Sequence, residues 1–148
     1  MDHRVWVYFY GSYINLEVLK EVELVPGAYE VATLPGFDIR IAPRANLVRD
    51  PQSVVYGILA TARHAELDRL YRDHAKGVLG EDYLPEAVIA YDTGGRLRPA
   101  LCYIAPAMTE RPAESAYVER IAKPAETYGF PADYVAKLRS FAPGTSDT

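Results

Sequence analysis

The sequence predicts an α+β domain with a small, mixed and mostly antiparallel sheet that can close into a β-barrel, and with flanking helices. Strand-like segments outnumber helical ones, and several follow one another directly along the chain, which favours antiparallel neighbours. Hydrophobic residues make up 49% of the 148 residues and charged residues 24%, the usual balance of a chain that buries a core. We expect one domain over residues 1–142 and a flexible tail over residues 143–148.

The expected strands are runs rich in Val, Ile, Tyr and Phe that are bounded by turn-forming residues. In chain order, they cover residues 5–10, 28–34, 37–42, 54–60, 83–91 and 97–105. Pro35 and Gly36 should form the turn between the second and third runs, and the last two runs should form a hairpin across residues 92–95. Residues 44–51 are expected to be a polar connection.

Two helices are expected in the first half of the chain, each after a residue that favours a helix start. Asn15 should cap a helix over residues 16–24, and Thr61 should cap a second over residues 63–73. The stretch 75–82 contains two glycines, which predicts a loop.

Two more helices are expected near the C-terminus. The apolar face of the first includes Tyr117 and Ile121 at helical spacing. Pro124 should kink or end that helix, because proline lacks the N–H that continues the hydrogen-bond ladder. Pro131 should begin the last helix, where its fixed φ is favourable.

Charge and apolar content exclude two classes of partner. The formal net charge is −4, and no basic block could neutralise several phosphates, so we expect no nucleic-acid partner. No apolar run is long enough to cross a bilayer, and the first residues lack the apolar segment of a signal peptide. We therefore expect a cytoplasmic protein with no membrane partner.

Cysteine and histidine give no sign of a metal site or a disulfide. Cys102 is the single cysteine, and its strand-like surroundings favour a small buried hydrophobe over a nucleophile. His64 and His74 lie ten residues apart, which is not the i, i+4 spacing of helical zinc ligands. No partner cysteine accompanies His3 either, so we expect no metal.

Tyrosine is unusually frequent, with 12 copies against 4 phenylalanines. Each ring combines apolar bulk with a polar tip, so a small domain could use several to line a polar cavity. The alternative is that many rings lie half-exposed on strands, where tyrosine is favoured in any case. Composition alone favours the alternative.

The segment over residues 10–15, here called the glycine turn, carries the main functional signal. Its residues are Tyr10, Gly11, Ser12, Tyr13, Ile14 and Asn15. A strand that passes through a glycine into a helix leaves backbone N–H groups free for an anion or oxyanion. The turn is too short for a phosphate-binding loop and suits a small carboxylate or a developing alkoxide. In the alternative interpretation, Gly11 only turns the chain and Ser12 only caps the helix.

The glycine turn resembles the Tyr-Gly-Ser-Leu/Asn loop of the γ-glutamylcyclotransferase-like superfamily, also called the AIG2-like group. The resemblance continues through Pro-Arg-Ala-Asn-Leu-Val at residues 43–48 and the strand at residues 53–59, and it covers nearly the whole chain. It implies a small β-barrel with flanking helices. It also implies that the free α-amine of a γ-glutamyl group attacks its own γ-carbonyl, which gives 5-oxoproline and releases an amine or amino acid. This chemistry requires neither a metal nor a cofactor.

The resemblance also assigns residues to the site. The superfamily's catalytic glutamate stands in Leu-Asp-x-x-Glu-Gly, whereas here Tyr71 occupies the glutamate position. A phenol with a pKa near 10 is a poor general base. Glu81 is the preferred replacement base, with Asp82 and Glu86 behind it; the alternative for each is a solvated loop carboxylate.

Substrate contacts are expected from the glycine turn, from Tyr83 and from Arg44, which could form a bidentate pair with a substrate carboxylate. The alternative for Arg44 is an exposed loop arginine. Three functions remain open. The first is a cyclotransferase acting on a γ-glutamyl amine or amino acid. The second is a non-catalytic relative that binds a γ-glutamyl or carboxylate metabolite. The third is another acyl or amide chemistry with Tyr71 as a proton donor.

Overall fold

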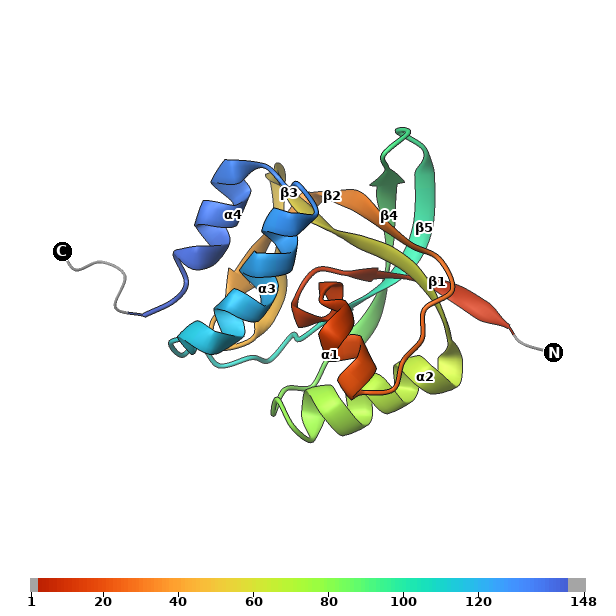
Figure 1. The fold of residues 1–148 in the computed structure, drawn as a ribbon, viewed down its shortest axis with the longest axis horizontal. Helices are drawn as coiled ribbons and strands as arrows, with labels where there is room; N and C mark the ends of the chain where they lie inside the picture. The colour runs from red at the N-terminus through yellow and green to blue at the C-terminus, as the bar shows by residue number, and fades with distance from the viewer. Residues whose placement is uncertain (1–2, 144–148) are drawn as a thin grey trace.

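The protein, described over residues 3–143 by a computed structural model, has five strands closed into a barrel with helices around it (Figure 1). The strands are β1 (Arg4–Phe9), β2 (Tyr29–Ile41), β3 (Ala45–Arg63), β4 (Leu84–Asp92) and β5 (Leu97–Ile104). The helices are α1 (Leu16–Glu21), α2 (His64–Arg69), α3 (Ser115–Thr127) and α4 (Ala132–Arg139). A 3₁₀ turn, η1 (Ser12–Ile14), precedes α1, and a π-helix, η2 (Leu70–Lys76), continues α2.

The barrel order is β1-β3-β2-β4-β5, and β5 returns to β1. Neighbouring strands are antiparallel except β1 and β5, which pair in parallel at Val7 and Leu101. The expected mixed, mostly antiparallel sheet is therefore confirmed, as is its closure. Figure 1 places α3 and α4 together on one side of the barrel and α2 below it. The expected tail lies outside the described residues from position 144 onward.

The two strands predicted over residues 28–34 and 37–42 are wrong, because β2 is one continuous strand. Pro35 and Gly36 form an irregularity within it, where the pairing with β3 shifts register and Gly36 adopts a φ of +89°. The reversal comes later, at residues 42–44, where the Ala42 N–H donates to the Arg44 carbonyl. The polar connection predicted over residues 44–51 is also wrong, since Ala45 onward belongs to β3 and alternates buried and more exposed side chains.

The second predicted helix is present but differs at both ends. Thr61 is not its cap; it lies in β3, and its hydroxyl accepts a bond of 2.8 Å from the Ala28 N–H. The cap position is Arg63, whose N–H donates to the Glu66 carboxylate at 2.9 Å. The helix then widens into η2 and continues to Lys76, beyond the predicted end.

Pro124 does not end the helix, because α3 runs through it to Thr127. A proline at position 124 cannot donate to the carbonyl of Arg120 one turn earlier. The Asn15 side chain supplies that bond instead, with Nδ2 3.0 Å from the Arg120 oxygen. The same side chain caps α1 by accepting from the Glu17 N–H at 2.9 Å. Asn15 therefore joins the start of α1 to the middle of α3.

Replacing Asn15 with alanine should lower the free energy of unfolding by about 1–2 kcal/mol, because both bonds are lost. Asn15→Asp is the matched control, since it keeps the acceptor for Glu17 but loses the donor to Arg120. We expect Asn15→Asp to lie between the wild type and Asn15→Ala in urea denaturation. Equal stability of all three proteins would contradict the role of this side chain.

Two buried polar groups sit at the barrel. Cys102 is fully buried on β5, and burial raises the pKa of its thiol to about 12, which removes it as a nucleophile, as expected. Asp38 on β2 contacts the Lys137 ammonium of α4, and Arg40 donates to it at 2.6 Å. Burial by itself raises the pKa of Asp38, but these two bonds outweigh it and hold the pKa below its usual value.

Asp38→Asn should lower the free energy of unfolding by about 1–2 kcal/mol at neutral pH, an amount reduced by the partial exposure of both cations. A carboxyl whose pKa is depressed by folding stabilises the fold above its unfolded pKa, near 3.9, and loses that effect as the pH falls through the folded pKa. The gap between wild type and variant should therefore be constant at neutral pH and shrink below about pH 4. A gap that persists unchanged at pH 2 would contradict the ion pair.

Candidate functional site

A pocket opens where β1 ends in the glycine turn. The side chains around it are mostly aromatic: Phe9, Tyr10, Tyr13, Tyr71, Tyr83, Tyr103 and Tyr117, with Gly11, Ser12, Ala45 and Leu79 completing the wall. Six of the 12 tyrosines therefore line this one site, so the cavity interpretation accounts for half of them. Its free volume is about 20 Å³, room for about one water molecule.

The glycine turn supplies the polar part of the pocket. Gly11 is followed at once by η1, and the N–H groups of Gly11, Ser12 and Tyr13 donate to no acceptor within residues 3–143. Three successive N–H groups of this kind suit a carboxylate or an oxyanion. A side chain at position 11 would meet β3, because its Cβ would lie 2.6 Å from the Cβ of Ala45. Glycine is thus required for the turn to lie this close to the barrel.

Tyr117, from α3, connects this turn to β3. Its hydroxyl accepts a bond of 3.0 Å from the Ala45 N–H and also bonds the Ser12 side chain. Tyr83 binds the same segment, since its hydroxyl donates to the Ala45 carbonyl. Both phenols therefore hold the pocket wall in place.

Tyr71 is the central ring of the pocket. It stacks on Tyr103 with 3.8 Å between ring centres and an angle of 10°, and it meets Tyr13 edge-on at 5.6 Å. Burial raises the pKa of the Tyr71 phenol well above its usual value, and the neighbouring phenols raise it further. The hydroxyl therefore stays protonated, which suits a proton donor and excludes a general base.

Tyr13 reaches from the pocket to η2. Its hydroxyl lies 2.9 Å from Nδ1 of His74, and the two rings are 5.7 Å apart. Burial lowers the pKa of His74, so the neutral ring can accept this bond. The contact fixes the orientation of one wall of the pocket.

Arg44 and Glu81 lie beside the pocket rather than in its wall. Arg44 Nε donates to the Leu79 carbonyl at 3.1 Å, and the guanidinium lies 4.8 Å from the centre of the Tyr117 ring. Burial raises the pKa of Tyr83 and Tyr117; the charge of Glu81 adds to this and the charge of Arg44 opposes it. Both charges therefore act on the same two phenols.

The structure divides the predicted site residues into three groups. Those that line the pocket are Tyr10, Gly11, Ser12, Tyr13, Tyr71 and Tyr83. Those that do not are Ile14, whose side chain is buried in the core, and Asn15, which caps α1. Arg44 and Glu81 form the third group, beside the wall. Of the reserve carboxylates, Asp82 pairs with Lys76 at 3.3 Å and Glu86 pairs with Arg49.

Sequence reasoning missed several wall residues, chiefly Tyr103 and Tyr117. Tyr117 was expected only as part of an apolar helix face, and Tyr103 only as part of a strand. Tyr103 reaches the site because β5 returns beside β1, and this closure has no local signature in the sequence. The high tyrosine count was the one signal that could have pointed to them.

The barrel and its flanking helices have the same fold as solved structures of γ-glutamyl cyclotransferases and AIG2-like proteins. One solved structure, described as a gamma-glutamyl cyclotransferase, has a TM-score of 0.78 and 19% identity, covering 99% of this chain and 92% of the other. The glutathione-specific γ-glutamyl cyclotransferase of yeast has a TM-score of 0.65 and 13% identity, over 93% and 95% of the two chains. An AIG2-like protein of Mus musculus has a TM-score of 0.57 and 14% identity, over 72% and 82%.

No protein-family model matches the chain, and no curated protein matches it by sequence. Across residues 3–143, no helix is long and apolar enough to cross a membrane. Over the same residues, no group of three His, Cys, Asp or Glu side chains is arranged to hold a metal ion.

Proposed function

We propose that this protein binds a small ligand carrying a carboxylate or amide carbonyl, of the γ-glutamyl kind, in the tyrosine pocket and does not cyclise it. One observation carries the proposal. Over the described residues, the pocket wall combines unpaired backbone N–H donors with aromatic rings and contains no carboxylate. The donors can hold a negative oxygen, but no lining group can take a proton from an ammonium.

Arg44 supports the anionic character of the ligand. Its Nε is held by Leu79, while no Asp or Glu of residues 3–143 lies within 4.0 Å of its guanidinium. The remaining N–H groups are thus available to a carboxylate at the mouth of the pocket. The free volume of about 20 Å³ means that the rest of the ligand enters only when part of the pocket wall moves.

Cyclisation is the second candidate. It is favoured by Glu81, whose charge acts on two phenols of the pocket wall, Tyr83 and Tyr117. Glu81 would take a proton from the α-ammonium, and the nitrogen would then attack the γ-carbonyl carbon. As the bond to the leaving amine breaks, Tyr71 would donate a proton to that amine and regain one from the attacking nitrogen, which loses its second proton as the lactam forms; Glu81 would return its proton to the released amine. Correct folding of the substrate in the pocket would supply most of the rate.

Calorimetric titration with a γ-glutamyl amine, with 5-oxoproline measured in the same samples, separates the two candidates. We expect binding without product, and a loss of affinity of about tenfold in Arg44→Ala, because a charged hydrogen bond is removed. Arg72→Ala is the matched control, since Arg72 pairs with Asp68 on the exposed surface of α2 and η2. Product formation that Glu81→Gln abolishes would establish cyclisation instead, and no binding across a panel of γ-glutamyl and carboxylate ligands would reject both.

A further inference from the structure

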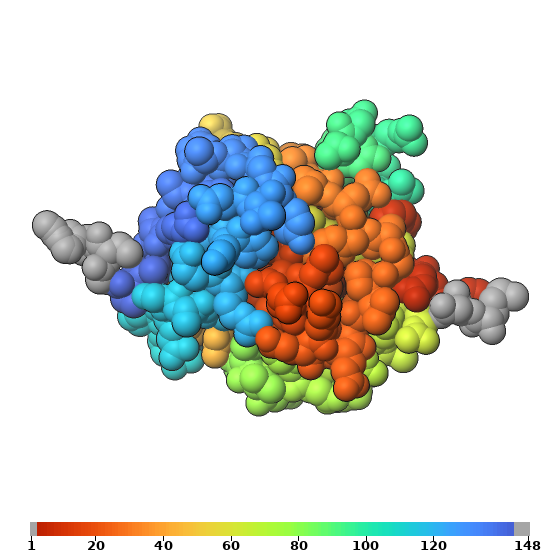
Figure 2. Space-filling view, viewed as in Figure 1, coloured from red at the N-terminus to blue at the C-terminus, as the bar shows by residue number. Residues whose placement is uncertain are grey.

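The Tyr71 ring contacts three other rings of the tyrosine pocket. Between ring centres, Tyr103 lies at 3.8 Å in a stack, Tyr13 at 5.6 Å edge-on and Tyr83 at 5.9 Å. The elements around the pocket are closely packed, and Figure 2 shows the surfaces of α1, α3 and the α2–η2 helix meeting on one face of the molecule. A ligand group that enters beside Tyr71 therefore separates it from at least one of these rings. An aromatic group restores the lost ring contact, whereas an alkyl group does not.

The hydrogen bonds of the pocket wall determine which donors are left for a ligand. Four of its six phenols already bond other groups of the protein, namely those of Tyr10, Tyr13, Tyr83 and Tyr117. The hydroxyls of Tyr71 and Tyr103 make no hydrogen bond to any residue of the range 3–143. Besides the N–H groups of residues 11–13, the free donors of the wall are therefore two neutral hydroxyls.

The γ-glutamyl half of the proposed ligand uses the strong donors. It carries one α-carboxylate and one amide carbonyl, and these match Arg44 beside the wall and the unpaired N–H groups of residues 11–13. A γ-glutamyl amino acid carries a second carboxylate on its other half. The donors that remain for it are the phenols of Tyr71 and Tyr103, which have no charge to compensate it. Taking a carboxylate out of water without a charged partner is costly, so this second carboxylate weakens binding.

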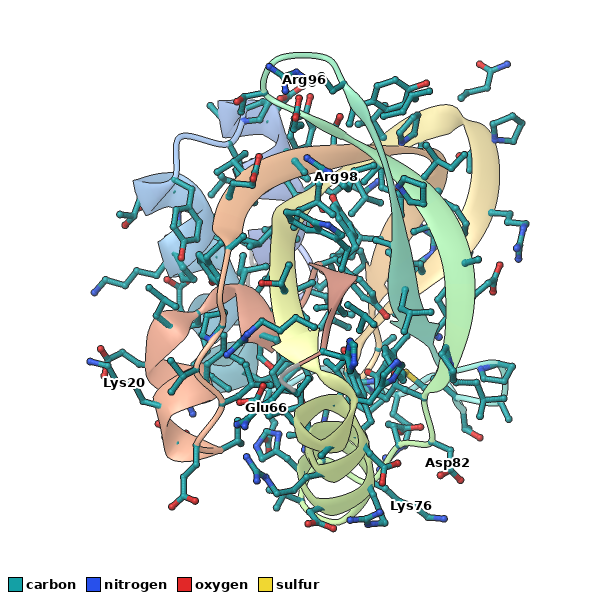
Figure 3. All side chains as sticks on the ribbon, turned by 90° about the vertical axis from the view of Figure 1, so that its right-hand side faces the viewer. Lys20, Glu66, Lys76, Asp82, Arg96 and Arg98 are labelled. Atoms are coloured by element: carbon teal, nitrogen blue, oxygen red, sulfur yellow. The ribbon has the colours of Figure 1, made fainter. Side chains whose placement is uncertain are left out.

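The two cations of η2 that carry full positive charge are engaged outside the pocket. Arg72 pairs with Asp68 at 2.7 Å and Lys76 pairs with Asp82 at 3.3 Å, and all four side chains are more than half exposed. Figure 3 shows Lys76 and Asp82 at the outer edge of the molecule. Burial raises the pKa of Tyr103, and the negative charge of Asp68 raises it further, so a second negative group beside this ring is also disfavoured.

We propose that the half of the ligand beyond the γ-amide is an uncharged aromatic amine, and that Tyr103 is the residue that selects it. This inference deepens the proposed function and rests on it. Tyr103 suits the role because its ring is half-buried in the pocket wall and its backbone is fixed in β5, where the Tyr10 hydroxyl donates to its carbonyl at 2.7 Å. A ring held in this way contacts a ligand ring at a small cost in conformational entropy.

Calorimetric titration of the whole protein with three γ-glutamyl conjugates tests the proposal. The phenethylamine and phenylalanine conjugates share the aromatic ring and differ in the second carboxylate. The cyclohexylethylamine conjugate is uncharged and of similar size but has no aromatic ring. We expect the phenethylamine conjugate to bind at least about tenfold more tightly than the phenylalanine conjugate, because the second carboxylate is left without a charged partner. It should also bind at least about threefold more tightly than the cyclohexylethylamine conjugate, the effect of one aromatic contact.

Tyr103→Leu keeps apolar bulk at this position but removes the ring. This variant should bind the phenethylamine and cyclohexylethylamine conjugates equally. Tyr91→Leu is the matched control, because Tyr91 lies on the same hairpin but is 37% exposed and outside the pocket wall. It should keep the preference of the wild type for the aromatic ring.

Three results would overturn the inference and leave the proposed function standing, because the γ-glutamyl group still binds in each. The first is a phenylalanine conjugate that binds as tightly as the phenethylamine conjugate. The second is a wild type without preference for the aromatic ring, or a preference that Tyr103→Leu retains. The third is a γ-glutamyl diaminobutane that binds more tightly than all three conjugates, which would assign the rings to a cation instead. Binding of none of these conjugates would reject the proposed function as well.

Discussion

Replacing Tyr71 with glutamate should convert the proposed binding protein into a cyclotransferase. The sequence pattern predicts that Tyr71 takes the position of the superfamily's catalytic glutamate, and its ring lines the same pocket as Ser12 and Tyr13, whose N–H groups donate to no acceptor within residues 3–143. A carboxylate here would have the reach to take the proton from the α-ammonium of a γ-glutamyl ligand. A positioned general base contributes about 10²–10⁴-fold, so 5-oxoproline formation should rise at least about 100-fold over the wild type.

The surroundings of Tyr71 favour this result. Burial among phenols raises the pKa of Tyr71, and the same burial should raise the pKa of a glutamate toward neutral, where a base is most effective. The smaller side chain also removes the stack on Tyr103 and frees space for the ligand. Tyr71→Gln is the matched control, because it opens the same space without supplying a base. Equal product from the two variants, or none from Tyr71→Glu while the ligand still binds, would show that the base is not what the wild type lacks.

Segments whose contacts are local were predictable from the sequence. The β4–β5 hairpin follows from two alternating runs around Gly94 and Gly95, and the observed strands begin and end within one residue of the prediction. The start of α4 after Pro131 follows from the fixed φ of proline. Both the hairpin and the start of α4 are determined by residues that lie within a few positions of them in the sequence.

Segments decided by distant partners were not predictable in this way. Pro35 and Gly36 have the composition of a turn, but β3 pairs with β2 on both sides of them and keeps the strand continuous. Pro124 has the composition of a helix end, but Asn15 binds the carbonyl that it leaves free. In both cases a tertiary contact compensates for what the local sequence lacks.

The candidate site shows the same division. The glycine turn is a local feature, and the sequence located it together with Tyr71 and Tyr83. Tyr103 comes from a strand that meets β1 through the barrel closure, and Tyr117 comes from a helix far along the chain. The segment around Tyr71 therefore pointed to Tyr71 as a candidate site residue, but it could not show which side chains surround its ring.

Replacing Gly11 with alanine should abolish ligand binding, with an affinity loss of at least about 100-fold, equivalent to about 2.8 kcal/mol. The added Cβ would lie 2.6 Å from the Cβ of Ala45, closer than carbon atoms can approach, so the turn or β3 must move. Either movement displaces the unpaired N–H groups of the glycine turn. It also strains the bonds from Ala45 to Tyr117 and Tyr83, which hold the wall.

A second substitution makes this prediction specific to the clash. Ala45→Gly removes the Cβ that the new side chain would meet, so Gly11→Ala combined with Ala45→Gly should recover most of the affinity. Ala45→Gly alone should bind nearly as well as the wild type, because Ala45 contributes to the site through its backbone N–H and carbonyl. Calorimetric titration of the four proteins forms a double-mutant cycle with a large favourable coupling. Additive losses would mean that Gly11 acts through the flexibility of the turn and not through its close approach to β3.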